Sequence, residues 1–201
     1  KKPSSLKRIL KDKTMQAMFI FRLLNAFGIS ALMGFLPLLA ERIGISVFQI
    51  GLIVTANLLV STAFQRYFGI LADKSDKVAM LISGSVMMLV ALALIPLSAN
   101  FYTLLLFNIL MGFGSAVSIP AGSAITAQLG RKLGMGSVMG LFNTAFGIGG
   151  GIGPIIAGLI MVAFGLATVF VLSAIIVLIG TIIFYYLMKN NIEYKKLMQE
   201  A

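Results

Sequence analysis

Six long apolar segments constrain the fold of this chain more than any other feature of its sequence. Each has the length of about 20 mostly apolar residues that a helix needs to cross the hydrocarbon core of a bilayer. With 59% hydrophobic and 11% charged residues, the chain has too few charges for a soluble domain, in which about a quarter of the residues are charged. The sequence therefore predicts an all-α membrane protein with six transmembrane helices. Their predicted ranges are 14–40, 47–72, 78–98, 101–129, 136–164 and 167–188.

The distribution of basic residues predicts how these segments cross the membrane. Nearly all of the 16 Lys and Arg residues lie in the two tails and near the connectors 73–77 and 130–134, whereas Arg42 alone lies in the other set of connectors. Because Lys and Arg accumulate in cytoplasmic loops, both termini are predicted to be cytoplasmic. The predicted organisation is a basic cytoplasmic linker at 1–13, a six-helix bundle at 14–188 and a cytoplasmic tail at 189–201.

The basic start of the chain allows two interpretations. Leu6, Ile9 and Leu10 are spaced for one helical face, which predicts a short helix on the membrane surface over 5–13. The same residues are equally compatible with a solvated linker. The chain starts with Lys1 rather than Met and contains no signal peptide, so we expect it to be a piece of a longer protein.

The composition argues against an enzyme. The chain has no Cys and no His, which removes zinc sites, thiol nucleophiles and histidine bases. None of its 6 acidic residues falls in the middle of an apolar segment, so no buried carboxylate pair is available. Neither a metal nor another cofactor is expected. The net charge of +10 lies in tails and connectors, which fits a membrane surface better than nucleic acid.

Amide side chains lie at membrane depth in four of the six segments. A buried amide is costly in hydrocarbon unless it is hydrogen-bonded. The first, second, fourth and fifth segments are therefore predicted to face a cavity or each other. The third and sixth carry few polar groups, as expected of lipid-facing helices. The amides are Asn25, Asn57, Gln65, Asn108 and Asn143.

Arg22 is the only charged residue well inside a segment, roughly 12 Å from its start at 1.5 Å per residue. An Arg at mid-bilayer costs about 2.5–3.5 kcal/mol on insertion scales. Two arrangements are open. The long side chain either snorkels to the cytoplasmic interface, or it faces a cavity with Asn25 one turn away and binds an anionic group.

Pro37 and Pro120 fall late in the first and fourth segments. If the six helices form two groups of three, these prolines occupy roughly corresponding positions. Interruptions placed in this way indicate inverted repeats around a midplane binding site. The alternative is two ordinary prolines of membrane helices.

A charged stretch between the second and third segments carries the first of two motifs. Its residues are Gly69, Ile70, Leu71, Ala72, Asp73 and Lys74, with Lys77 following. It resembles the loop motif of the major facilitator superfamily, Gly-x-Leu-Ala-Asp-Arg/Lys-x-Gly-Arg/Lys-Arg/Lys, which joins the second and third helices of each six-helix half. Asp76 and Val78 depart from the motif, as is typical of the copy in the C-terminal half. Without the resemblance, the stretch is a charged turn at the cytoplasmic face.

The resemblance implies a role for each part of this loop. Gly69 would let two helices approach closely, and Asp73 would accept hydrogen bonds from the free amides of a nearby helix N-terminus. Lys74 and Lys77 would hold the loop at the anionic cytoplasmic surface. In the family, this network latches the cytoplasmic side during alternating access.

The fifth segment carries the second motif. Gly140, Gly149, Gly153, Pro154, Ala157 and Gly158 fit the spacing Gly-x8-Gly-x3-Gly-Pro-x2-Gly-Gly, with one Ala for Gly. The pattern is similar to the fifth-helix motif of superfamily antiporters. Gly149 with Gly153, and likewise Gly147 with Gly151, would let helices pack backbone to backbone, and Pro154 can bend the helix. Helix packing alone is the alternative.

Asn108 stands where the fourth-helix pattern of the family has an Arg that is tied to proton coupling in the N-terminal half. Its absence indicates the C-terminal half. The resemblance, which covers about 14–188, implies half of a twelve-helix transporter, with two inverted three-helix repeats and alternating access. Drug or sugar efflux by proton antiport is the implied activity, and the proton-coupling residue would lie in the other half.

The implied substrate cavity lies between this chain and a missing N-terminal half, or a second copy of the chain. Amides and aromatic rings without an acidic group suit a neutral or amphipathic small molecule. The implied setting is the lipid bilayer of a bacterial-type plasma membrane. The alternative is a stand-alone six-helix protein: a homodimeric half-transporter, a scaffold, or a channel, although the ring of charges or filter loop of a channel is missing. The candidate cavity residues are Arg22, Asn25, Asn57, Asn108, Phe142, Asn143 and Phe146.

Overall fold

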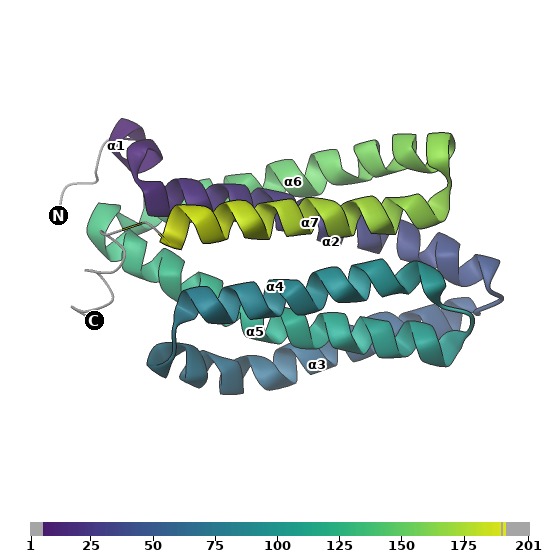
Figure 1. The fold of residues 1–201 in the computed structure, drawn as a ribbon. Helices are drawn as coiled ribbons and strands as arrows, with labels where there is room; N and C mark the ends of the chain where they lie inside the picture. Colours follow the sequence, from purple (N-terminus) through teal and green to yellow (C-terminus); the bar gives the residue numbers. More distant parts are fainter. Residues whose placement is uncertain (1–5, 190, 192–201) are drawn as a thin grey trace.

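The protein is a bundle of long antiparallel helices (Figure 1). The computed structural model describes residues 6–189 and residue 191, and this part of the chain contains helices only. Six of the helices are long and apolar enough to span a membrane, which confirms the six predicted spans. The helices are α1 (Leu6–Lys11), α2 (Lys13–Arg42), α3 (Val47–Lys74), α4 (Lys77–Leu94) with a 3-10 turn (Ile95–Leu97), α5 (Phe101–Leu133), α6 (Met135–Phe164) and α7 (Leu166–Lys189).

Short connectors with specific capping residues separate the helices. Ser46 and Asn100 each form a capping box at the start of α3 and α5, where the side chain accepts the backbone N–H three residues on. Gly134 and Gly165 have positive φ angles of 112° and 89°, a backbone conformation that other residues rarely adopt. Each lets one helix end and the next begin within a single residue.

The helix contacts have the two-repeat pattern expected from the prolines. α2 packs against α6 and α7, α5 packs against α3 and α4, and α4 packs against α7. Exchanging α2, α3 and α4 for α5, α6 and α7 reproduces this set of contacts. The first of these groups starts at the end of the bundle that holds α1, and the second starts at the opposite end (Figure 1). The chain is therefore built of two inverted three-helix repeats.

α3 and α6 lie at opposite sides of the bundle, with the other long helices between them (Figure 1). Only 17% and 22% of the residues in their most apolar stretches are buried, against 44–56% in the other four spans. The helices predicted to face lipid, α4 and α7, instead contact each other at the centre as well as their neighbours. Their apolar surfaces serve helix packing and lipid contact alike, so low polarity alone did not identify the outermost helices.

Glycines set the closest helix contacts. A Cβ atom at Gly84 of α4 would lie 2.6 Å from the backbone oxygen of Gly114 in α5. On the other side of the bundle, a Cβ atom at Gly149 of α6 would collide with the backbone oxygen of Leu23 in α2. These positions let α4 meet α5, and α6 meet α2, backbone to backbone.

We expect Gly149→Ala to destabilise the bundle by about 1–3 kcal/mol, because the added methyl group overpacks against the backbone of α2. Gly147→Ala is the matched control, since no atom of this chain lies within 4 Å of a Cβ there. It should leave stability unchanged or slightly higher, because Ala favours a helix over Gly. Thermal unfolding and folded yield in detergent compare the two, and equal losses would contradict the close packing of α2 and α6.

Candidate functional site

Arg22 lies against the aromatic rings of α6. Its Cζ atom is 4.8 Å from the centroid of the Phe142 ring and 4.4 Å from that of Phe146. Such cation–π contacts contribute about 0.5–2 kcal/mol each, more when the cation is desolvated. The rings lie about 10 and 16 Å along α6 from its first residue, Met135. The side chain therefore stays at the depth of these rings instead of reaching the bundle end.

The guanidinium of Arg22 is only partly satisfied. Its Nε atom is buried and has no hydrogen-bond partner in the part of the chain that the structure describes. The nearby Asn25 makes no hydrogen bond with it, and the Asn25 Nδ2 atom donates to the backbone oxygen of Phe21 at 3.1 Å. Asn143, next to Phe142 on α6, is exposed. Arg22, Phe142 and Phe146 form a cationic and aromatic cluster at one side of the α2–α6 contact, which we call the Arg22 cluster.

Two of the candidate cavity amides lie elsewhere, between α3 and α5. The Nδ2 atom of Asn57 donates to the backbone oxygen of Asn108 at 2.8 Å, and that of Asn108 donates to the backbone oxygen of Leu104 at 2.9 Å. Both residues are buried. Their hydrogen bonds tie two helices together within this chain and do not line one site with Arg22.

The loop motif lies at the junction of α3 and α4. Asp73 and Lys74 are exposed in the last turn of α3. The carboxylate that caps the next helix belongs to Asp76, which accepts from the N–H of Val78 at 2.8 Å and of Ala79 at 3.4 Å. Within the described chain, the proposed contact of Asp73 with a helix N-terminus is therefore absent. Asp76, a departure from the motif, caps α4 instead.

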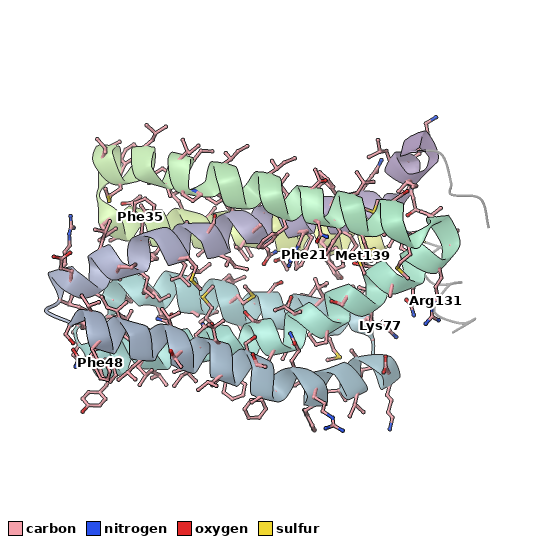
Figure 2. All side chains as sticks on the ribbon, turned by 180° about the vertical axis from the view of Figure 1, so that it is seen from behind. Phe21, Phe35, Phe48, Lys77, Arg131 and Met139 are labelled. Carbon is pink, nitrogen blue, oxygen red and sulfur yellow. The ribbon has the colours of Figure 1, made fainter. Side chains whose placement is uncertain are left out.

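The other residues of the loop motif differ in burial. Ala72 is buried, and Leu71 is exposed. The atom nearest to a Cβ at Gly69 is Cβ of Pro120 at 3.9 Å, an ordinary contact, so Gly69 does not create a close approach in this chain. Lys77 is only 6% exposed and lies at the same end of the bundle as Arg131 (Figure 2).

The glycines of α6 divide between two faces. Gly149 and Gly153 contact Leu23, Phe27 and Ser30 of α2. Gly158 makes only an ordinary contact with Phe35, and Pro154 lies within the continuous helix. A second face of α6 has open space within 4 Å of each glycine. Its members are Gly136, Gly140, Gly147 and Gly151, with the exposed Asn143 among them.

α3 also has an exposed polar face, which the sequence analysis missed. Thr55, Thr62, Arg66 and Asp73 are exposed, and their spacings of 7, 11 and 18 residues from Thr55 bring them to one side of the helix. Helical periodicity read over the span would have revealed this stripe. We call it the α3 polar face, and the open glycines of α6 the α6 glycine face.

The described residues contain no group of three or more acidic, His or Cys side chains that could hold a metal ion. The candidate features are the Arg22 cluster, the loop motif and the two outer faces.

Comparison with known proteins identifies the family of the chain. Residues 18–198 match the family model described as Major Facilitator Superfamily. An uncharacterized MFS-type transporter of Methanocaldococcus jannaschii is 28% identical over 88% of this chain and 45% of its own length. The multi-drug resistance efflux pump PmrA of Streptococcus pneumoniae is 27% identical over 85% of the chain and 43% of the pump. Multidrug resistance protein MdtG of Proteus mirabilis is 28% identical over 84% of the chain and 43% of that protein.

The chain thus spans less than half the length of these relatives. The family match covers α3 to α7 completely and most of α2, and so includes all six spans. The six-helix bundle, its inverted repeats and this match have one common explanation: the chain belongs to the major facilitator superfamily.

Proposed function

We propose that this chain is the C-terminal half of a twelve-helix secondary transporter, which exports a small organic solute by alternating access with proton antiport. The observation that carries the proposal is that α3 and α6, the least covered spans, each present a line of small or polar residues among their exposed apolar ones. Threonine, asparagine and arginine side chains in hydrocarbon need polar partners. A second six-helix unit against these faces would provide such partners.

Three further observations support the assignment to the C-terminal half and the proposed export activity. The relatives are more than twice as long as the part of them that the chain matches, and two of those compared are named for multidrug resistance. Asn108 replaces the Arg that the family has in its N-terminal half, and the loop motif is weakened at Asp76. The basic residues gather at the end of the bundle that holds α1, which favours cytoplasmic termini in a bacterial-type plasma membrane.

In this proposal the Arg22 cluster lines the substrate cavity and selects the charge of the solute. Asp73 and Glu41, the acidic residues within the described spans, lie at helix ends, so Arg22 is the charge well inside them. A partly unpaired guanidinium with two aromatic faces suits an aromatic solute that has an anionic group.

The competing function is a half-transporter in which a second copy of this chain replaces the N-terminal half. The same outer faces would then be covered by a symmetric partner. The two assemblies differ in mass and in which chain supplies the proton-coupling residue, so both can be tested directly.

We expect Gly151→Leu to reduce folded yield severalfold in the complete protein and to be neutral in the 201-residue chain alone. The reason is that the α6 glycine face is open here and would be covered by the other half. Yield and detergent-solubilised mass provide the measurement. A neutral result in the complete protein would assign this face to lipid, and disruption of a dimer of the chain alone would favour the second-copy assembly.

We expect Asp73→Asn to reduce transport at least tenfold while leaving membrane insertion intact. Asp73 is exposed at the end of α3, where its charge can pair with a helix N-terminus of the other half. Asp76→Asn is the matched control, because Asn caps a helix as well as Asp does. Efflux from cells or vesicles distinguishes the two variants, and normal transport by Asp73→Asn would refute the latch.

We expect Arg22→Gln to weaken binding of 1-naphthalenesulfonate roughly tenfold or more, since hydrogen bonds to charged groups contribute about 1.5–3 kcal/mol. Binding of the cation 1-naphthylmethylammonium should stay equal or improve. Arg42→Gln, at the other end of α2, is the control and should change neither. Titrations on the complete protein measure both probes, and an unchanged preference in Arg22→Gln would remove Arg22 from the solute site.

A further inference from the structure

We propose that the corner between α1 and α2 is a binding site for one anionic phospholipid of the bilayer. The site consists of an apolar pocket of about 190 Å3 and two exposed lysines at its rim. It lies outside the Arg22 cluster and does not depend on which solute the protein moves.

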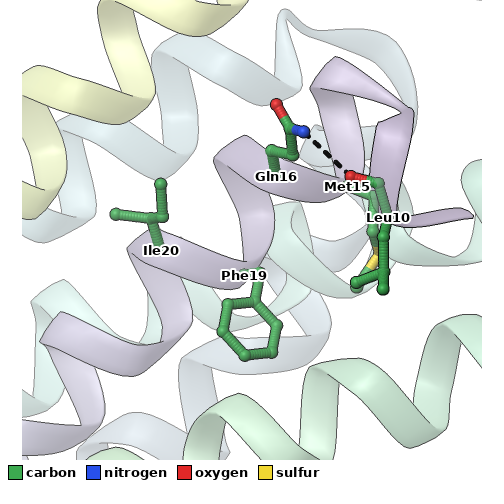
Figure 3. A pocket seen from close by; sticks show the side chains of 5 residues that line it. All are labelled: Leu10, Met15, Gln16, Phe19 and Ile20. Carbon is green, nitrogen blue, oxygen red and sulfur yellow. Dashed lines mark hydrogen bonds between the residues drawn. The ribbon is translucent and has the colours of Figure 1, made fainter. Parts of the chain in front are cut away.

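The pocket forms because α1 is docked against the bundle. Ile9 of α1 is fully buried in a cluster with Met15, Leu129 and Val138 from α2, α5 and α6. The side chain of Gln16 then joins the two helices, its Nε2 atom donating to the backbone oxygen of Leu10 at 2.8 Å. The predicted surface helix is therefore fixed to the bundle by the burial of Ile9 and by the Gln16 hydrogen bond, which Figure 3 shows.

The lining of the pocket is almost entirely hydrocarbon. Figure 3 shows the side chains of Leu10, Met15, Phe19 and Ile20 around it, with Gln16 at one side. Leu10 is 47% exposed, which leaves the pocket open to the surroundings. Apolar cavities of roughly 150 Å3 already bind small hydrocarbons, so this pocket can accept part of an acyl chain.

Positive charge lies at the mouth of the pocket. Lys13, Gln16 and Ile20 are spaced by three and four residues, so Lys13 lies on the pocket face of α2, nearer its start. Lys11 follows Leu10 at the end of α1, and both lysines are exposed. The acid at this corner among the described residues is Asp12, which caps α2, with its Oδ1 atom accepting from the N–H of Met15 at 3.0 Å. Neither lysine has a partner within the described part of the chain, so both can meet a phosphate.

The depth of the site selects a lipid over other occupants. The pocket covers the first two turns of α2, about 3–11 Å from its start, where headgroups meet acyl chains. An anionic headgroup on the lysines with its chain in the pocket satisfies both parts of the site. A second copy of the chain is disfavoured there, because its own basic end, with a net charge of +10 overall, would be repelled.

The test uses the complete protein in a neutral detergent, with native mass spectrometry to count bound lipid and thermal shift to measure its effect. Phosphatidylglycerol should bind more tightly and raise the melting temperature more than phosphatidylcholine with the same chains. Lys11→Gln and Lys13→Gln should each weaken phosphatidylglycerol binding roughly fivefold. Arg42→Gln is the control, because Arg42 is exposed at the far end of α2, and it should have no effect on binding.

Two further arms separate the headgroup from the chain. Ile20→Phe, which fills the pocket, should weaken both lipids, and Leu10→Phe on the exposed side of the pocket replaces it if the first variant folds poorly. Glycerol 3-phosphate, which has the headgroup charge without the chain, should not stabilise the protein. Equal binding of both lipids, equal stabilisation by glycerol phosphate, or an equal loss in Arg42→Gln would each overturn the proposal.

Discussion

Every polar group inside hydrocarbon needs a hydrogen-bond partner, and this requirement organises the whole bundle. Helices satisfy the backbone, so only polar side chains remain to be paired. Some find partners within the chain: Asn57 donates to the backbone of α5, and Asn25 to its own helix. Others, on the α3 polar face and at Arg22, find none here. Buried side-chain atoms of Ser85, Ser98 and Gln128 also have no partner among the described residues, so a missing partner alone does not mark an outer surface.

The inverted repeats explain why the outermost helices are α3 and α6. In the exchange of repeats these two helices correspond, and each contacts mainly one helix of the other repeat. The glycines of α6 lie on two sides of the helix. Gly149 and Gly153 let α2 pack closely, while Gly147 and Gly151 have no neighbouring helix of this bundle against them. A helix with small residues on both sides can pack within one half and against another.

The sequence predicted much of the fold, because membrane spans are read from length and hydropathy alone. All six spans and the two-repeat arrangement were correct. The candidate site was harder to predict than the fold. The depth of an Asn residue in the membrane can be estimated from the sequence, but the direction of its side chain cannot. Asn57 and Asn108 stay candidate cavity residues, and within this chain the Asn57 side chain donates to the α5 backbone. The contact of Asp73 with a helix N-terminus also stays a prediction, while Asp76 caps α4. A family motif gives the residue types of a contact but not the helix that each side chain meets.

Arg22 connects assembly with selectivity. A guanidinium at this depth is costly, and cation–π contacts with Phe142 and Phe146 offset only part of that cost. A partner that supplies hydrogen-bond acceptors would lower the free energy of the assembled protein, and so would an anionic solute in the same place. If the other half left Arg22 fully paired, a solute would gain little there. If it left Arg22 partly unpaired, an anionic solute that paired with the guanidinium would remove the remaining desolvation free energy and so bind more tightly. In the proposed assembly, the charge preference for the solute would therefore depend on how many acceptors the other half places around this one side chain.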